Sequence, residues 1–461
     1  MTSILDGLNT VQQALAAQQS ALSATQRNVA NANDPSYTRQ VAVFVPDQYE
    51  GNGGVDGFSI QVARNQHLDS SISQELQESG KQSLMSDALQ QIDAVFNGTT
   101  GQGLQQALSD FFNSFSSLST APENLNLRQQ VLSKAEALTS EFYRIYTGIQ
   151  QVQLSENSEL ASTVDEINSI TARIADLNMR VAAAEGAGSD DQFQLRDSRQ
   201  QLLEQLSNLT DLSYFPTELG YITVTTRQGG VLVVGNESHD LTLAPAPGGG
   251  LTGIQLDGVD ITGSISSGKL GGLLNVRDNY AASYLNTLDD MAAGIISAVN
   301  AQHAAGIDLD GAAGGDFFTP FTQPAPGSNT GAARSMSLAL NDPRKIAAAA
   351  AGSAVGDNQN SKLIAAIKDQ ALFSGATATA SQFYASLLYQ IGSDERSAED
   401  GASVQSSVLE QLKNQRDALS AVNLDEEATN LIKYQKAYEA SAQFAKVLDN
   451  LSEDIISLLG V

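Results

Sequence analysis

The sequence of 461 residues contains no cysteine, no tryptophan and only three histidines. Without cysteine the chain can form neither disulfides nor thiolate metal sites, whichever compartment it occupies. Basic residues are scarce as well: 25 Lys and Arg stand against 52 Asp and Glu, for a formal net charge of −27. This negative charge repels phosphate groups, and the sequence contains no cluster of basic residues that could bind them. We therefore expect no nucleic-acid partner.

Hydrophobic runs are short. No stretch approaches the roughly 20 apolar residues that span a bilayer, so we expect no membrane insertion. The opening residues MTSILDGLNTVQQ lack the basic and apolar regions of a cleaved secretory signal. Aromatic residues amount to 6% of the chain, a proportion that favours long, narrow helical packing over a large compact core.

Two segments resemble motifs for nucleotide or metal binding, but each lacks residues that the motif requires. GSISSGKL ends on Leu270, where a phosphate-binding loop needs a hydroxyl for magnesium, so we expect a β turn that leads into a helix. GIDLDGAAGGD places Asp308, Asp310 and Asp316 in a glycine-rich loop, but it lacks the third oxygen ligand and the final glutamate of a calcium loop. We predict a polar turn there, with a weak cation site as the alternative.

Catalytic groups are not clustered along the sequence. His67, His239 and His303 lie far apart and form no zinc motif, and no serine lies in the G-x-S-x-G pattern of hydrolases. Adjacent carboxylates such as Asp289 and Asp290 fall on a helical pattern and are best explained as a solvated face. We therefore expect no catalytic residue, no cofactor and no metal, and a protein that is not an enzyme.

Both ends of the sequence carry the apolar spacing of coiled-coil helices. We predict that residues 1–40 and 422–461 form one terminal domain, in which two helices pack in a parallel or antiparallel pair. Their other faces carry Gln, Ala, Ser and Asn, which suits contacts on several sides, and a one-sided coiled coil is the alternative. The residues predicted to pack are Leu8, Val11, Leu15, Leu22, Val29, Leu424, Leu431, Tyr438, Leu448, Leu451 and Ile455.

The intervening sequence predicts a longer helical domain interrupted by β structure. Residues 41–212 and 271–421 carry long apolar stripes, with a β hairpin near 41–63 and an irregular loop at 306–345. Short strands with glycine turns fill 213–270 and indicate an inserted β domain. The predicted fold class is mainly α with an inserted β domain (α+β), in which the helical domains are discontinuous along the chain.

Two segments together carry a family resemblance: ANANDPSYTRQ at 30–40 and AVNLDEEATNLIKYQKAYEASAQF at 421–444. The combination resembles the axial proteins of the bacterial flagellum, which carry an Asn-rich turn after a heptad helix. The YTRQ ending and the acidic NLDEE run point, within that family, to the members at the hook–filament junction. QFQLRDSRQQLLEQL, GGLLNVRDNY and VNAQHAAGIDLDGAAGGDFF resemble the same family, so the resemblance spans nearly the whole chain.

The chain departs from the family pattern at one turn and in its length. Asp34-Pro35-Ser36-Tyr37 stands where the family commonly has Thr-Pro-Gly-Tyr, so a turn with positive φ at Ser36 is disfavoured. The chain is also short for the family, with room for one β insertion rather than two outer domains.

The resemblance implies a structural protein with coaxial domains: terminal helices in the inner tube, long helices around them and the β insertion outside. The implied partners are further copies of the chain in a helical array, the hook protein, the filament-side hook-associated protein and a cytoplasmic export chaperone on the C-terminal helix. Export unfolded through the flagellar type III apparatus would take the chain from the cytoplasm to the extracellular flagellum. The alternatives are another axial protein, such as the filament-side junction protein or flagellin, and a secreted adhesin or hydrolase.

Within ANANDPSYTRQ the residues are assigned roles in shaping the chain. Asn31 and Asn33 are predicted to bond backbone groups at the helix C-terminus. Pro35 is predicted to stop the helix, and Tyr37 and Arg39 to anchor the outgoing chain in the assembly. A plain turn without subunit contacts is the alternative.

Overall fold

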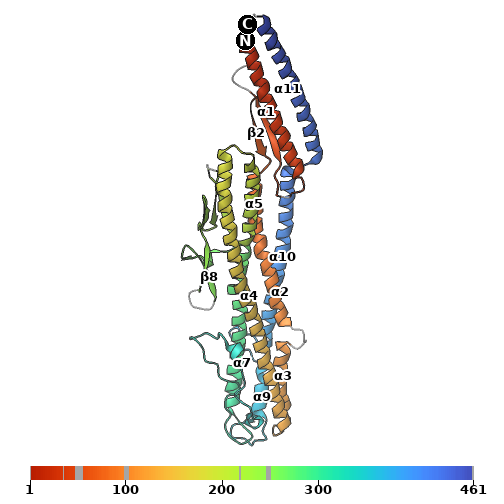
Figure 1. Ribbon diagram of the computed structural model, residues 1–461. Coiled ribbons are helices and arrows are strands. Elements are labelled where there is room, and N and C mark those ends of the chain that lie inside the picture. Colours follow the sequence, from red (N-terminus) through yellow and green to blue (C-terminus); the bar gives the residue numbers. More distant parts are fainter. Residues whose placement is uncertain are drawn as a thin grey trace.

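The computed structural model is a long rod with the two chain ends together at one end (Figure 1). A terminal unit of two helices and a β hairpin forms that end, and a helical body with three small sheets forms the remainder. The structure describes residues 2–34, 36–46, 55–97, 103–217, 220–245 and 251–458.

The terminal unit pairs the first and last helices of the chain. Helix α1 (Thr2–Ala30) lies beside α11 (Leu424–Leu458), and strands β1 (Gln40–Pro46) and β2 (Val55–Val62) form an antiparallel hairpin against α1. The sequence predicts a hairpin near 41–63, and the structure places one at 40–62. The residues that join the two strands lie outside the described part of the chain.

The two terminal helices run antiparallel. Gly7 lies against Leu448, and the Gln18 amide donates to the Ser441 hydroxyl at 3.2 Å. At the other end of α1, the Asn28 amide donates to a Glu427 carboxylate oxygen at 3.1 Å. The contact partners on α11 thus fall in reverse order along α1, which decides between the parallel and antiparallel arrangements left open by the sequence.

The packing between α1 and α11 differs from the predicted set of residues. Val11 is buried and Leu8, Leu15, Leu22, Leu431 and Leu448 are half-buried. Val29, Leu424, Tyr438 and Leu451 are instead exposed by 42%, 54%, 39% and 47%, and the Ile455 side chain lies outside what the structure describes.

The correction has a physical cause at each end of the contact. Ala17, Ala21 and Ala24 are buried along α1, which packs on both α11 and the hairpin, so small side chains account for part of the buried surface of α1. Near the body, Asn28 and Glu427 are buried and bonded to one another, whereas Val29 and Leu424 are exposed. Heptad spacing alone does not distinguish a buried amide or carboxylate from an exposed one.

The body is organised along one helix of 62 residues, α4 (Leu125–Gly186). The sequence predicts one or two long helices over this stripe, and the structure contains one. Its first turn is capped by the Asn124 side chain, which accepts from the backbone N–H groups of Asn126 and Leu127. The buried stripe from Val131 to Val181 takes part in both hydrophobic clusters of the body, so α4 joins them into one rod.

Other helices surround α4. The helices α2 and α10 pack along one another, and α3, α6 and α7 each contact α4. Their bounds are α2 (Gln66–Asn97), α3 (Leu104–Leu118), α5 (Asp191–Leu209), α6 (Gly268–Asn275), the π-helical turn η2 (Val276–Tyr280), α7 (Ala281–Ala304), α9 (Gln359–Ala366), η4 (Ile367–Asp369) and α10 (Ala380–Ser420).

Aromatic side chains are concentrated at the end of the body far from the termini. Phe111, Phe112 and Phe115 of α3 are fully buried against Phe317 and Phe318, with ring centroids 5.0 to 5.8 Å apart. A sequence poor in aromatic residues therefore still builds one dense aromatic core, because these rings gather in one cluster.

Two small sheets lie against the middle of α4. Their buried residues, among them Val224, Leu232 and Ile254, share one hydrophobic cluster with α4, α5 and α6. The first sheet has the order β3 (Leu212–Pro216), β4 (Ile222–Thr226), β5 (Val231–Val234) and β6 (Glu237–Ser238). The second contains β7 (Leu241–Pro245), β8 (Thr252–Leu256) and β9 (Val259–Asp260) and is followed by η1 (Thr262–Ser264).

The segment GSISSGKL begins helix α6, as the sequence predicts for a turn that leads into a helix. The Ser266 backbone N–H and hydroxyl both donate to the Asp211 carboxylate, at 3.2 and 3.3 Å. These donors are therefore engaged by a carboxylate of the chain itself.

The loop predicted at 306–345 is tied down by buried polar groups. The Ala347 N–H donates to His303 Nε2 at 2.8 Å, so His303 Nδ1 carries the proton that it donates to the Gly315 carbonyl at 2.7 Å. Burial lowers the pKa of His303 and favours this neutral form. The segment also contains β10 (Gly306–Ile307), α8 (Ala332–Ser335) and η3 (Pro343–Lys345), and β10 pairs with β11 (Ala349–Ala350).

Two aspartates of this loop, Asp308 and Asp310, have cations of the chain as partners. Lys345 donates to Asp308 and Asp310 at 3.1 Å in each case, and Arg344 pairs with Asp310. These contacts lower the pKa of Asp310. Within the described residues, no three His, Asp or Glu side chains are grouped so that they could hold a metal ion.

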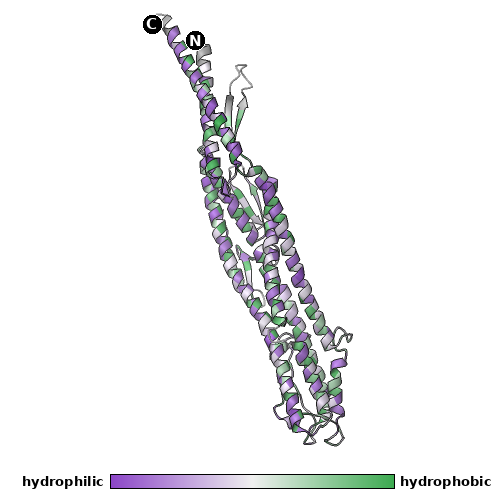
Figure 2. Ribbon diagram, turned by 90° about the vertical axis from the view of Figure 1, so that its right-hand side faces the viewer, coloured by the Kyte–Doolittle hydropathy of each residue, from purple (hydrophilic) through white to green (hydrophobic). Residues whose placement is uncertain are grey.

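Along the helices, apolar residues alternate with polar ones and do not form long uninterrupted apolar segments (Figure 2). Green and white segments alternate with purple ones over the whole length of the rod in that view. Among the described helices, none combines the length and the hydropathy that crossing a membrane requires.

We predict that Glu156, on α4, makes the stability of the body depend on pH. It is 6% exposed and its Oε2 has no hydrogen-bond partner, and burial, with a smaller contribution from Glu159, raises its pKa from 4.5 to about 7. The folded chain thus holds this proton more tightly than the unfolded chain. Stability falls as pH rises between the two pKa values, because the buried charge is costly above the higher one.

Glu156→Gln should raise the free energy of unfolding by about 1–3 kcal/mol near pH 8 and change little near pH 4, measured by denaturant titration. Glu166→Gln, at an exposed position of the same helix, is the control and should change neither value appreciably. An equal effect of Glu156→Gln at both pH values would contradict the titration argument.

Candidate functional site

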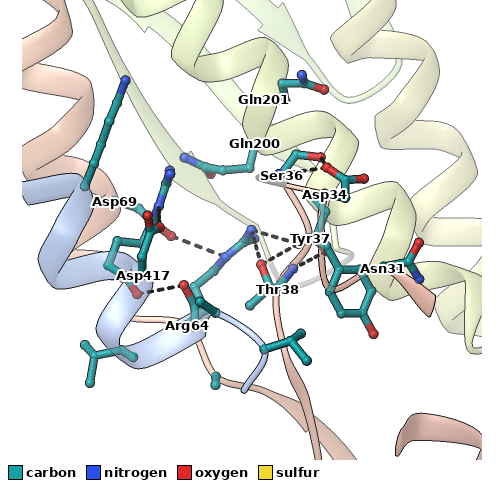
Figure 3. Close-up of a pocket in the computed structure, with 18 of the residues that line it drawn as sticks. Asn31, Asp34, Ser36, Tyr37, Thr38, Arg64, Asp69, Gln200, Gln201 and Asp417 are labelled. Carbon is teal, nitrogen blue, oxygen red and sulfur yellow. Dashed lines mark hydrogen bonds and ion pairs between the residues drawn. The ribbon is translucent and has the colours of Figure 1, made fainter. Parts of the chain in front are cut away.

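The terminal unit and the body meet at a joint, which we define by residues 27–40, 63–69, 190–204 and 413–427. Chain segments cross it after α1, after β2 and between α10 and α11. A cleft of about 590 Å³ opens here between the linker after α1, the start of α2, helix α5 and the end of α10. Figure 3 shows Arg64 and Thr38 pointing toward one another inside it, with Asp69 and Asp417 on the opposite wall.

Helix α1 ends at Ala30, and the linker that follows is shaped by short side chains. The Asn31 amide donates to the Arg27 carbonyl at 2.9 Å, an acceptor at the helix C-terminus. Asn33 is exposed, and its side chain makes no hydrogen bond to the described residues. Pro35 lies outside the described part of the chain, so its predicted role in stopping the helix stays a prediction.

Ser36 stabilises the turn in which the family commonly has glycine. Its backbone N–H and its hydroxyl both donate to Asp34 Oδ1, at 2.9 and 2.7 Å. Ser36 is not among the described residues with positive φ. The turn is therefore an Asp-centred one that uses the serine hydroxyl, and it needs no glycine conformation.

Asn28 is the centre of a buried network that the sequence did not single out. Its Oδ1 accepts from the Tyr37 hydroxyl at 2.8 Å and from the Gln40 N–H at 2.9 Å. Its Nδ2 donates to the Gln40 carbonyl at 2.9 Å and to Glu427 at 3.1 Å. Burial raises the pKa of Tyr37 to about 12, so the phenol stays protonated as a donor. This one amide joins α1, β1 and α11.

Arg39 ties the outgoing strand to the acidic start of α11. Its Nε donates to Glu427 and its Nη2 to Glu426, each at 2.8 Å, and its backbone N–H donates to the Ser420 carbonyl at 2.9 Å. Glu427 is 2% exposed in its side chain, whereas Glu426 is 57% exposed. The acidic run NLDEE thus contributes one buried and one surface partner to the same guanidinium.

Asp197 of α5 connects the linker to the body. Its carboxylate accepts from the Thr38 N–H at 3.0 Å, from the Thr38 hydroxyl at 2.8 Å and from Arg64 at 2.9 Å. Arg64 also pairs with Asp69 at 3.3 Å. Burial raises the pKa of Asp197, against the lowering effect of the Thr38 bonds and the Arg64 charge. One carboxylate therefore fixes both chain segments that leave the hairpin.

A second link lies on the surface of the joint. Arg27 pairs with Asp190, just before α5, at 3.0 Å, and its Nε donates to Gln40 at 3.0 Å. Both charged groups are partly exposed, so this pair contributes little stability. The joint is thus a set of hydrogen bonds and ion pairs that orient the terminal helices on the body, and Asp190, Asp197 and Glu427 each pair with an arginine.

Of the predicted motif residues, Asn31, Tyr37 and Arg39 take part in these contacts. Sequence reasoning missed Asn28, Arg64, Asp197 and Glu427. Asp197 lies within QFQLRDSRQQLLEQL and Glu427 within the acidic run of α11, so both were in stretches that resemble the family, but no residue there had been assigned a role.

Known proteins match the chain over its whole length. The family model described as flagellar hook-associated protein FlgK helical domain matches residues 89–318, and that described as flagellar basal body rod FlgEFG protein C-terminal matches 415–458. Flagellar hook-associated protein 1 of Bacillus subtilis is 29% identical, over 100% of this chain and 99% of that protein. The chain belongs to the family of flagellar hook-associated protein 1.

Membership of this family confirms the resemblance to flagellar axial proteins and makes the chain a structural component of the flagellum. The hook-associated protein 1 of Escherichia coli is 25% identical, over 98% of this chain and 99% of that protein. The alignment with the Bacillus subtilis protein runs over 507 positions against 461 residues here, so that protein contains segments that this chain lacks.

A solved structure has the same fold. The flagellar hook junction protein FlgK from Burkholderia pseudomallei superposes with a TM-score of 0.68 at 17% identity, over 76% of this chain and 100% of that chain. The predicted fold class, mainly α with inserted β structure, is confirmed by this likeness.

We predict that Glu427 stabilises the terminal helix pair far more than Glu426 does. Glu427→Gln removes the buried charge between Arg39 and Asn28 and should lower the local stability of α1 and α11 by about 1–3 kcal/mol, measured by native-state hydrogen exchange. Glu426→Gln removes the exposed partner of the same arginine and should cost about 0.5 kcal/mol or less. Equal effects of the two variants would contradict the proposed role of the buried network.

Proposed function

We propose that the chain is the adaptor that joins hook to filament, and that it acts by assembling in repeated copies around the flagellar axis. The observation that supports this best is an apolar stripe on α11 that is exposed among the described residues. An array of such copies needs a contact between unlike surfaces, because repetition of that contact gives an open helical assembly.

The α11 stripe consists of Phe444, Val447 and Leu451, which are exposed by 54%, 57% and 47%. Their spacing of three and four residues puts them on one face of the helix. The neighbouring face, with Ser441, Ala445 and Leu448, is the half-buried one that lies toward α1. A helix with two apolar faces is suited to contact a second helix of another molecule.

The exposed side of α1 is suited to close approach of other copies. Between Gly7 and Ala30 the only charged residue is Arg27, and the exposed positions include Asn9, Gln12, Gln13 and Gln19. In a chain with a net charge of −27, an uncharged helix surface avoids the repulsion that identical acidic subunits would otherwise exert.

The partners of this adaptor follow from its position. We propose the hook protein on one side, the filament-side hook-associated protein on the other, and further copies of the chain around the axis. Before assembly, the α11 stripe is the surface that a cytoplasmic export chaperone would cover. The chain would leave the cell unfolded through the flagellar type III apparatus and act outside it, without catalytic activity.

The domain roles are part of this proposal. The terminal unit would lie in the inner tube, the body in the surrounding shell, and the sheets at 212–260 on the outer surface. The motif residues Asn31, Asn33, Pro35, Tyr37 and Arg39 would act indirectly, because they set the direction in which α1 and α11 leave the body.

A variant of the stripe tests the assembly surface. Phe444→Ser, Val447→Ser and Leu451→Ser together should lower binding of the purified chain to isolated hooks by tenfold or more, since about 25 cal/mol is lost per Å² of apolar area left exposed to water. Co-sedimentation with hooks measures it. Val404→Ser with Val408→Ser, exposed by 59% and 37% on α10, is the control and should bind normally.

A deletion of the gene tests the adaptor role itself. Cells without this chain should keep their hooks, lack filaments and release flagellin subunits into the medium, because filament growth would have no attachment point. Electron microscopy of the cells and analysis of secreted protein measure this outcome. Normal filaments on the deleted strain would refute the adaptor role.

A further inference from the structure

Arg199 of α5 is a buried arginine that uses only part of its hydrogen-bonding capacity. It is 5% exposed, and its Nη1 donates to Asn178 Oδ1 and to the Gly220 carbonyl, each at 2.8 Å. These bonds tie α5 to α4 and to the loop before β4. The guanidinium forms no ion pair with a described carboxylate.

The opposite edge of the Arg199 guanidinium has no partner among the described residues. Nε is buried and unpaired there, and Nη2 makes no hydrogen bond to a described group. The same Nε/Nη2 edge holds both oxygens of a carboxylate in other arginines of this body: Arg144 binds Glu141 through it, and Arg277 binds Asp278. This edge matches the geometry of a carboxylate group, which it binds side-on with two parallel bonds.

Arg199 lines a second cleft, of about 580 Å³, on the side of the joint that faces the first sheet. The acidic residues that line it already have partners: Asp69 and Asp197 pair with Arg64, and Glu185 pairs with Arg196. Among the described residues, the positive charge of Arg199 is thus left without a dedicated counter-charge. Burial, with a contribution from Arg196, lowers its pKa to about 10, which still leaves it protonated at neutral pH.

A buried charge without a counter-ion is costly, and pairing it within an open cleft recovers part of that cost. We propose that the Nε/Nη2 edge of Arg199 is a carboxylate-binding site, which is unpartnered among the described residues of the single chain and is filled by an Asp or Glu side chain of a neighbouring copy. The choice of occupant rests on the proposed assembly and on the charge of the chain, since each copy carries 52 acidic residues against 25 basic ones.

Formate tests the site on the single chain. In chain labelled with ¹⁵N-arginine, sodium formate at constant ionic strength should shift one Nε–H resonance saturably, and sodium chloride should not. Arg199→Lys, which keeps the charge but lacks the fork, should lose that resonance and leave the others in place. If no Nε–H resonance responds, or if the responding one persists in Arg199→Lys, the site does not exist.

A second variant leaves Arg199 intact. Thr217→Glu adds a carboxylate at an exposed position that lines the cleft, and should shift the same resonance and abolish the formate response. Thr217→Gln is the matched control and should leave the response unchanged. Equal behaviour of the two would overturn the site, because the added charge is their only difference.

The source of the natural carboxylate is decided by two further measurements. Glu218 follows Thr217 of the cleft in sequence and lies outside the described residues. Glu218→Gln should leave the Arg199 resonance in place. If this variant shifts the resonance without formate, the carboxylate belongs to the same chain. On isolated hooks, Arg199→Lys should bind about tenfold more weakly than the unaltered chain, the factor expected for one charged hydrogen bond.

The two proposals fail in different ways. If the unaltered chain does not bind hooks at all, the assembly proposal fails together with the neighbouring copy as occupant, whereas the formate titration still decides the site. If the unaltered chain and Arg199→Lys bind hooks equally, the neighbouring copy is excluded as occupant and the adaptor role stands.

Discussion

The side chain of Asn28 determines how the two ends of the chain meet the body. Its amide accepts from Tyr37 and Gln40 and donates to Gln40 and Glu427, so its two polar atoms are both fully used. Buried polar groups without partners are costly, and each member of this network therefore requires the others in their places. The hairpin, the linker and α11 are positioned by that requirement, and apolar contacts contribute less there.

Much of the fold could be predicted from periodicity. The stripe from Val131 to Val181 predicted α4, and the heptads at both chain ends predicted α1 and α11, because long runs with one apolar face leave few alternatives. Val29 and Leu424 were predicted to pack between the terminal helices, and both are exposed. Asn28 and Glu427 are buried instead, and polar residues on a helix carry no sequence signal of burial.

The joint was predictable only in part. The motif at 30–40 was recognised as a turn, and Tyr37 and Arg39 as residues that anchor the chain. Their partners are far away in sequence: Glu427 is 388 residues from Arg39, and Asp197 is 159 residues from Thr38. Such pairs follow from how α5 and α11 dock on the linker, which neither spacing nor composition encodes. The unpaired Nε/Nη2 edge of Arg199 could not be predicted for the same reason, since the sequence does not show which hydrogen bonds an arginine lacks.

Because α4 is long, a small change of angle at the joint corresponds to a large displacement at the far end of the body. At 1.5 Å per residue its 62 residues extend about 93 Å. A tilt of about 5° at the joint displaces the far end by about 8 Å, which is more than the distance between neighbouring strands of a sheet. The hydrogen bonds of Asp197 and Asn28 lie at this joint, so a small difference in the angle that they hold becomes a large displacement at the aromatic end of the body.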